Sequence, residues 1–280
     1  MNRHVYYRAI KRNKQRQDIA TKVITMVQRE RMKMPRIGTR KLYFLLYDKL
    51  QELGVGRDRL FSIMKANNLH IKPRKQYHIT TDSHHRFRKH KNLIEQLKIE
   101  RPEQVWVSDI TYVGTRENPM YLSLVTDAYS KKIVGYDLSN SLHATGVIAT
   151  LQMAIDSRMY QNKALIHHSD RGLQYCCIEY QQLLEKNTIS CSMTEKYDPY
   201  QNAIAERVNG ILKQEFIQGI VVKDIELMEK LIQETIYIYN QLRPHWSCHM
   251  HTPAFMHKQS KVKIKTYKIK NSIEENPNAN

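Results

Sequence analysis

The sequence is poor in the features that mark secreted and membrane proteins. It holds only four cysteines in 280 residues, too few for a disulfide framework, and none of them has the Cys-x-x-Cys spacing of a metal or redox motif. No apolar run approaches the ~18 residues that a membrane-spanning helix needs. Basic residues open the chain, but no apolar segment follows them, so no secretory signal is expected. These absences favour a protein of a reducing cytosol.

Acidic residues are scarce in the first third of the chain. Residues 1–100 hold 25 Lys or Arg against 8 Asp or Glu, whereas residues 101–260 hold 15 against 17. The net charge of +18 is therefore concentrated at one end. Solubility does not need this asymmetry, but the binding of a polyanion does. Nucleic acid is the favoured partner, because Lys and Arg neutralise its phosphates, whereas a membrane-binding amphipathic helix rich in aromatic residues is lacking.

The basic region contains a pattern of two helices joined by a turn. Leucines recur at helical spacing over residues 42–50, the turn LGVG occupies 53–56, and RDRLFSIMKANN forms a second helix with its apolar residues inward. This pattern is typical of a helix-turn-helix, although any small helical hairpin produces it. The charge distribution favours DNA binding, and we expect Arg57, Arg59 and Lys65 on the second helix to contact a groove or phosphates. The helical DNA-binding region is expected to span residues 1–71, and a basic linker residues 72–100.

From Gln104 onward the pattern changes to alternating strands and helices. Three β-rich runs come first, and helical and strand-like segments then alternate, which predicts a mixed α/β sheet flanked by helices. The expected strands cover 105–114, 120–130, 132–139, 164–170 and 189–193, and the expected helices cover 142–158, 177–187, 202–217 and 224–242. This core is expected to occupy residues 101–260, followed by a basic, flexible tail over residues 261–280.

Three carboxylates occupy unusual positions in this core. Asp109 lies inside an apolar strand, where an acid is costly unless it is paired or bound to a metal. Asp170 ends another strand, and Glu206 follows 35 residues later on an amphipathic helix. If the three converge, they form an all-oxygen site suited to magnesium. The pattern alone leaves the alternative that Glu206 and Lys213 are solvated charges opposite an apolar stripe.

Four segments resemble the second reading frame of the insertion sequence three family of bacterial transposases. They are WVSDITY, HHSDRGLQY, YDPYQNAIAERVNGILKQE and YNQLRPHWSCHMHTP, and the resemblance extends from about Tyr6 to Lys258. It implies an RNase H-like, integrase-type catalytic core, and the helical pattern of the basic region places a small all-α helix-turn-helix domain before this core. It implies that Asp109, Asp170 and Glu206 are the catalytic residues, holding two Mg²⁺ ions per active site with Mn²⁺ as a substitute. Lys213 would contact DNA beside the cut, and Arg171 would orient a ligand or touch phosphate.

The resemblance also implies an activity, partners and a location. The expected enzyme is a DNA transposase that cleaves transposon ends with metal ions and then joins strands through the 3′-hydroxyl. Its partners would be terminal inverted repeats, target DNA, further copies of itself and the upstream-frame product of the same element, with no membrane. The expected location is the bacterial cytoplasm, at the nucleoid. The alternative is an element-encoded, catalytically inactive DNA-binding repressor. Asn240, Arg243 and His245 fit either a structural or a DNA-contacting role.

Overall fold

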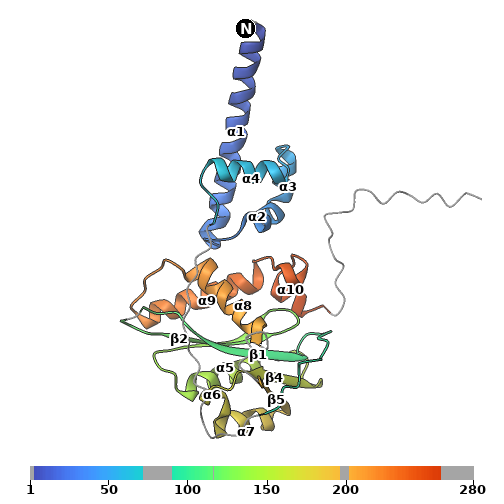
Figure 1. The fold of residues 1–280 in the computed structure, drawn as a ribbon, viewed down its shortest axis with the longest axis vertical. Coiled ribbons are helices and arrows are strands. Elements are labelled where there is room, and N and C mark those ends of the chain that lie inside the picture. Colours follow the sequence, from blue (N-terminus) through green and yellow to red (C-terminus); the bar gives the residue numbers. More distant parts are fainter. Residues whose placement is uncertain (1–2, 72–89, 116, 196–201, 260–280) are drawn as a thin grey trace, which may run out of the picture.

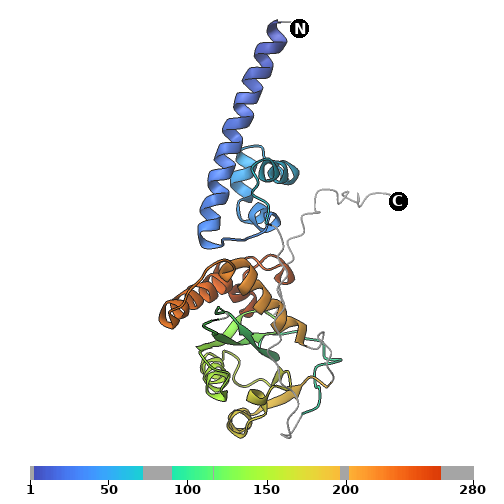
Figure 2. The ribbon, with the colours of Figure 1, turned by 60° about the vertical axis from the view of Figure 1, so that its left-hand side comes forward.

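The computed structural model describes residues 3–71, 90–115, 117–195 and 202–259. Most of the expected linker and the whole of the expected tail (261–280) lie outside the described residues. An N-terminal helical region stands above a layered α/β unit (Figures 1 and 2). None of the described helices is both long and apolar enough to span a membrane.

The α/β unit is built on a five-stranded sheet with the order β3-β2-β1-β4-β5. Its central strand β1 pairs antiparallel with β2 and parallel with β4, so the sheet is mixed, as the sequence predicts. The strands are β1 (Val105–Tyr112), β2 (Tyr121–Asp127), β3 (Ile133–Ser139), β4 (Leu165–Ser169) and β5 (Ile189–Met193). Each falls within one of the five predicted runs. The structure therefore confirms the mixed α/β sheet of the predicted fold class.

Helices cover both faces of this sheet. One face carries α8 (Ala203–Ile211), its π-helical continuation η2 (Leu212–Ile217), α9 (Ile225–Gln241) and α10 (Pro253–His257) (Figures 1 and 2). The other carries α5 (Ala144–Asp156), α6 (Leu173–Cys176) and α7 (Ile178–Lys186). Because side chains alternate along a strand, Leu122 and Leu124 of β2 join the first layer, and Val125 joins the second. The fully buried Trp106 packs into the second layer, so its role is packing.

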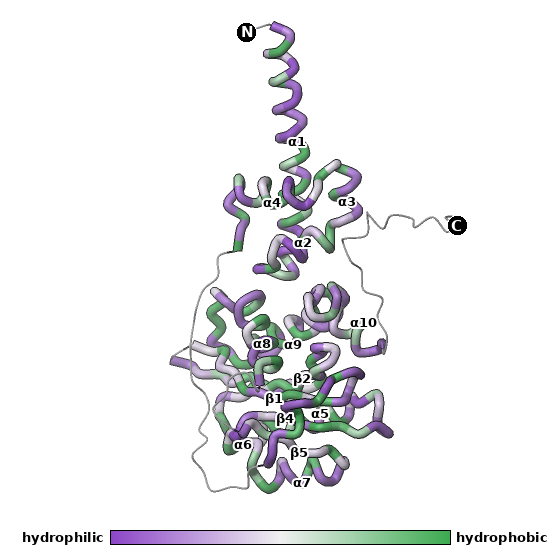
Figure 3. The backbone as a smooth tube through the Cα atoms, turned by 45° about the vertical axis from the view of Figure 1, so that its right-hand side comes forward, coloured by the Kyte–Doolittle hydropathy of each residue, from purple (hydrophilic) through white to green (hydrophobic). Residues whose placement is uncertain are grey.

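The N-terminal region is entirely helical. It comprises α1 (Arg3–Lys33), α2 (Thr39–Leu45), α3 (Tyr47–Glu52) and α4 (Arg57–Ala66). The buried Leu42, Leu50, Leu60 and Met64 face inward, as their spacing predicts. The first predicted helix is interrupted at Leu46, whose ψ of 10° lies outside the helical range. The outer part of α1 projects away from the body and is largely hydrophilic (Figure 3), and only Val23 and Val27 of this helix are fully buried.

Candidate active site

The sheet register brings Asp109 and Asp170 level with each other. Strands β1 and β4 are parallel, and Val107 is paired with His168. Two residues further along each strand direction, the same register aligns Asp109 with Asp170, which directly follows β4. The backbone N–H of Gly172 donates to Oδ1 of Asp170 at 3.0 Å and so helps to orient that carboxylate. Two acids separated by 60 residues in the sequence therefore lie level with each other just beyond the last pair of β1 and β4.

Helix α8 brings the third acid to the same face of the sheet. Ala205 of α8 is buried against Val105 and Val107 of β1, and the Nδ2 of Asn202 donates to the carbonyl oxygen of Ser108 at 3.0 Å. Glu206, next to Ala205, is exposed, while Val208 and Ile211 pack inward. The apolar stripe expected on this helix is therefore real, and it fixes Glu206 on the outer side of a helix that lies across β1.

The three carboxylates affect one another electrostatically. Burial raises the pKa of Asp109 to about 7, and the charges of Asp170 and Glu206 act in the same direction. Burial and the charge of Asp170 likewise raise the pKa of Glu206 above its ordinary value. Like charges have this effect only when they are close together. Within the described ranges, however, no three His, Cys, Asp or Glu side chains are arranged to hold one metal ion.

Two further side chains complete the surroundings of Asp109. The Nδ2 of Asn209 donates to Oδ2 of Asp109 at 2.7 Å, which favours the ionised carboxylate. The Nζ of Lys213 donates to Oγ1 of Thr111 at 3.4 Å. Burial lowers the pKa of Lys213, and the charge of Asp109 partly offsets this effect. Lys213 therefore lies beside the carboxylates, not on a remote solvated face.

Sequence reasoning did not single out Asn209 or Thr111. Asn209 lies three residues after Glu206, on neighbouring turns of one helix, and its side chain is 4% exposed. Thr111 lies two residues after Asp109 and so shares its face of the sheet. These spacings from Glu206 and Asp109 were the available signal in the sequence. The contact of Asn209 and Lys213 with β1 becomes evident only once α8 has packed on the sheet.

The other residues predicted from the sequence lie elsewhere or have partners within the protein. Arg171 directly follows Asp170 and is half-buried. On the exposed side of α4, Arg57 pairs with Asp58 at 2.9 Å and Arg59 donates to the carbonyl oxygen of Gly54 at 3.3 Å. Lys65 is exposed on the same helix. The structure therefore does not bring the α4 residues to the carboxylates.

The residues of the YNQLRPH segment make internal contacts. Asn240 bonds both the N–H and the carbonyl oxygen of Ile133, at 3.0 and 2.9 Å. Arg243 is 2% exposed and binds both carboxylate oxygens of Glu215 at 2.7 Å. His245 is 5% exposed. Of the two roles considered for these residues, their burial and contacts favour the structural one.

Comparison with known protein families identifies an integrase core. Two family models, each described as "Integrase core domain", match residues 99–199 and 187–253. An insertion element IS600 protein of 31 kDa from Shigella sonnei is 36% identical over 220 residues, covering 76% of this chain and 80% of that protein. Transposase InsF for insertion sequence IS3A of Escherichia coli (strain K12) is 35% identical over 159 residues, or 56% of this chain and 55% of that protein.

Further similarities are shorter or limited to structure. The transposase for insertion sequence element IS629 of Shigella sonnei is 37% identical over 122 residues, 44% of this chain and 40% of that protein. Among solved structures, the HTLV-2 integrase catalytic core domain in complex with magnesium is 18% identical, with a TM-score of 0.44, over 56% of this chain and 97% of that chain. A simian T-cell lymphotropic virus intasome is 16% identical, with a TM-score of 0.49, over 87% and 80%.

The bacterial relatives named above are all proteins of insertion sequences. Of the bacterial relatives named above, those with an assigned activity are insertion-sequence transposases, and none of these names supports the alternative of an inactive repressor. The match to the Shigella IS600 protein covers most of both chains, and the integrase-core matches together cover more than half of this one. The chain therefore belongs to the insertion-sequence transposases that carry an integrase core domain, the group that includes the insertion sequence three family.

Proposed function

We propose that this transposase cuts DNA at the ends of its element and transfers the freed 3′-hydroxyl to a second phosphodiester, with Asp109, Asp170 and Glu206 as its catalytic residues. One observation carries the proposal: the register of β1 with β4 and the packing of α8 on β1 bring these three acids to one part of the sheet, where burial and the charges of Asp170 and Glu206 raise the pKa of Asp109. The three acids come from a strand, a strand end and a helix, and their carboxylates lie close enough to repel one another. Such clustering costs stability, which is typical of functional sites.

The chemistry of the three donors suits divalent cations, although the described side chains do not surround a single ion position. Carboxylate oxygens are the ligands of hard ions, and a bound cation would offset both the burial and the like charges that raise the pKa of Asp109. Asp109, Asp170 and Glu206 would hold Mg²⁺, with Mn²⁺ as a substitute and two ions per site. Bound there, the ions would activate the attacking oxygen and stabilise the leaving oxygen of a phosphodiester.

Residues around the acids would hold the site and the DNA in place. Asn209 fixes the Asp109 carboxylate, and the N–H of Gly172 fixes that of Asp170. The ammonium of Lys213 lies near Asp109 and is suited to a phosphate oxygen beside the cut, because a cation there would partly offset the added negative charge. Arg171, next to Asp170, would offer a second cationic contact to the phosphates of the cut DNA strand.

DNA recognition would fall to the basic N-terminal region. Arg57, Arg59 and Lys65 lie on the exposed side of α4 and would contact terminal inverted repeats, chiefly through phosphates. Synapsis of two ends and a target would require further copies of the chain, and the upstream-frame product of the element would assist end recognition. The site of action would be the bacterial nucleoid.

Cleavage and joining of a labelled duplex that carries the terminal repeat of the chain's own element would test this proposal. With Mg²⁺, the wild-type chain should nick the duplex and produce joined strands. Glu206→Gln should abolish both products and retain DNA binding, whereas Glu234→Gln, at an exposed position of α9, should behave as wild type. Normal cleavage by Glu206→Gln would refute the site assignment. If the wild type binds the duplex but does not nick it, even with the upstream-frame product added, the protein is a repressor. If it nicks the duplex but does not join strands, it is a nuclease.

A further inference from the structure

A salt bridge connects the N-terminal helical region to the helix that carries Glu206. Helix α8 continues directly into the π-helical segment η2, which includes Lys213 and Glu215. The Nζ of Lys41, in α2, lies 2.9 Å from Oε1 of Glu215. The backbone N–H of Arg36, between α1 and α2, donates to the carbonyl oxygen of the same glutamate at 3.2 Å. Two segments about 175 residues apart in sequence thus meet at one residue.

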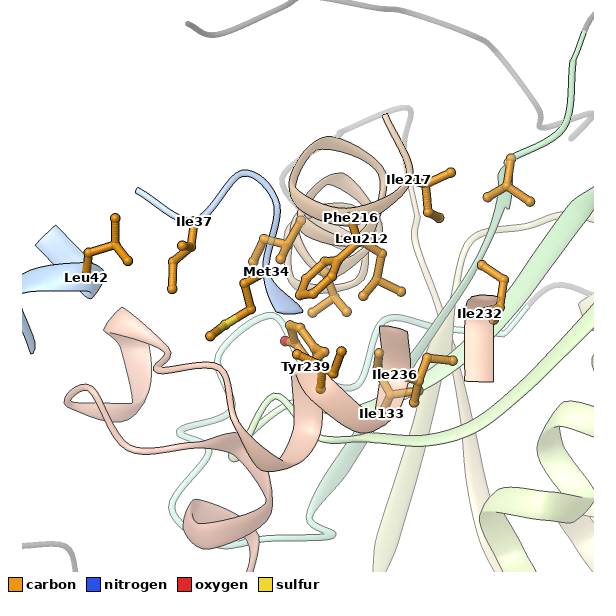
Figure 4. Packing of buried hydrophobic residues seen from close by; sticks show 14 of the residues in the cluster. Met34, Ile37, Leu42, Ile133, Leu212, Phe216, Ile217, Ile232, Ile236 and Tyr239 are labelled. Atoms are coloured by element: carbon orange, nitrogen blue, oxygen red, sulfur yellow. The ribbon is translucent and has the colours of Figure 1, made fainter. Parts of the chain in front are cut away.

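An apolar contact lies beside this salt bridge. Met34 and Ile37, which follow α1, are 2% and 0% exposed and belong to the same buried cluster as Leu212 and Phe216 of η2. Figure 4 shows Met34 beside Phe216 and Leu212, with Tyr239 of α9 below them. The helical region therefore rests on η2 through both apolar and charged groups, and the contact is part of a continuous core.

Glu215 already has a full partner inside the α/β unit. Arg243 donates to both of its carboxylate oxygens at 2.7 Å, the bidentate geometry that gives the strongest pairs. Lys41 adds a second cation, and its side chain is only 18% exposed. Burial and the charge of Arg243 lower the pKa of Lys41. A buried second cation of this kind adds little net stability, so stability does not account for its presence.

The local geometry of η2 suggests what the salt bridge does. π-Helical turns are rare and are found frequently at functional sites. A π-helical turn shifts the side chains that follow it relative to an α-helical continuation. Here the change begins one residue before Lys213, the side chain that reaches Thr111 beside Asp109. Glu215 lies two residues after Lys213 and is the anchor for this turn.

We infer that Lys41 and Glu215 couple the two parts of the chain: docking of the helical region on η2 positions Lys213, and with it the end of the catalytic helix, for cleavage. Glu215 is a positioning residue that acts through Lys213, and Lys41 is the contact by which the DNA-binding region controls it. The inference deepens the proposed function and rests on it. It predicts that DNA held by the helical region is cut efficiently only while the salt bridge is intact.

Three variants of the full chain test this coupling. Lys41→Met removes the charge and keeps the apolar stem, Lys41→Arg keeps the charge, and Arg40→Met removes a neighbouring exposed charge of α2 as the matched control. For each we would measure the melting temperature, the affinity for the terminal-repeat duplex, the single-turnover cleavage rate of the saturated complex with Mg²⁺, and amide exchange over residues 206–217 without metal.

Lys41→Met should bind the duplex with unchanged affinity and keep its melting temperature, because Arg243 still neutralises Glu215. Its cleavage rate should fall about tenfold, a typical effect of misplacing one charge at a reacting centre. Amide exchange over residues 212–217 should become faster, with the duplex bound and without it. Lys41→Arg should restore the cleavage rate and the rate of amide exchange, and Arg40→Met should leave these two rates at wild-type values.

Two outcomes would overturn the coupling. One is cleavage and exchange at wild-type rates in Lys41→Met. The other is a parallel loss of DNA affinity with an unchanged rate in the saturated complex, which would make Lys41 an ordinary DNA contact. If the wild-type chain does not cleave with Mg²⁺, the proposed function fails, whereas exchange over residues 212–217 still decides whether Lys41 holds this segment.

Discussion

Asn209 of α8 holds the carboxylate of Asp109 on β1 by a hydrogen bond of 2.7 Å. The bond joins the helix that carries Glu206 to the strand that carries the first acid. Because an amide donor favours the charged form of a carboxylate, Asn209 opposes the burial and like charges that raise the pKa of Asp109. Asn209 therefore influences both the position and the ionisation of the acid.

Replacement of Asn209 by alanine should lower the cleavage rate and shift its pH dependence. Without the amide donor the pKa of Asp109 in the metal-free protein rises further, so that Mg²⁺ binding, and with it the ascending limb of the pH–rate profile, moves to higher pH. The rate at pH 7 should fall about tenfold, equivalent to one lost hydrogen bond to a charged group. Asn162→Ala, which removes an exposed amide outside the site, is the matched control. Identical profiles for Asn209→Ala and the wild type would contradict this role.

Asp109→Asn should stabilise the metal-free protein while abolishing cleavage. A carboxyl whose folded pKa is raised contributes stability below its unfolded value near 4, and this contribution is lost as the pH rises through about 7. At pH 8 the variant should gain about 1–2 kcal/mol in unfolding free energy, after allowance for solvent screening of a partly buried group. Urea unfolding at pH 5 and pH 8 measures this difference.

A bound divalent metal ion should make the wild type more stable than Asp109→Asn, the reverse of the order expected without metal. Added Mn²⁺ should stabilise the wild type by mass action and have little effect on Asp109→Asn, because the variant lacks one ligand. Asp18→Asn, on the exposed surface of α1, serves as the control for the loss of a negative charge. Equal stability of wild type and Asp109→Asn at pH 8 would mean that the carboxylates do not repel one another in solution.

Far from these acids, His257 of α10 should make stability depend on pH. Its Nε2 lies 3.3 Å from Oε1 of Glu103, and its Nδ1 lies 3.5 Å from Oδ2 of Asp127. Burial acts to lower the pKa of His257, but the two carboxylates raise it above its ordinary value of 6.5. Arg158 and Lys132 are the nearby cations that oppose this effect or share the carboxylates.

The sign of the His257 effect follows from the raised pKa. Its stabilising contribution is complete below pH 6.5 and is lost as the pH rises through the folded pKa. His257→Gln should therefore cost about 1–3 kcal/mol at pH 5.5 and clearly less at pH 9, as measured by urea unfolding. His251→Gln, at the start of the same segment and stacked on Phe255, should show no such trend. A cost independent of pH would show that His257 stays neutral.

Lys65→Ala should weaken DNA binding without affecting cleavage of the bound DNA. Lys65 is exposed on α4, where Arg57 is already paired with Asp58. If its ammonium neutralises one phosphate, the slope of log affinity against log salt concentration should become shallower by about 1. Lys98→Ala, in an exposed pair with Glu100 outside α4, is the control. An unchanged salt dependence for Lys65→Ala would remove α4 from the DNA contact surface.

Local pattern predicted the elements of this fold well, because each strand and helix carries its own periodicity. Leu42, Leu50 and Leu60 are buried where their spacing indicates, and Asp109 lies within a strand as expected. The break at Leu46 and the π-helical turn were not predicted, since no residue type marks them. Both depend on how the helices pack on other elements.

Contacts between distant segments were the part that the sequence could not provide. The alignment of Asp109 with Asp170 depends on the register of β1 and β4, and the hydrogen bond from Asn209 depends on the path of α8 across the sheet. The pairing of Lys41 with Glu215 links the basic region to the core and has no local signature. Each is a consequence of tertiary packing, in which residues far apart in the sequence become neighbours.

The parallel pairing of β1 with β4 limits how this protein can vary. An insertion or deletion of a single residue between Val107 and Asp109 would turn the carboxylate to the opposite face of the sheet, away from α8, while most of the apolar packing survived. Length changes beyond Gly172, by contrast, leave the alignment of the two strands intact. Natural variation in chain length should therefore concentrate after the strand ends and spare the few residues that lead into each acid.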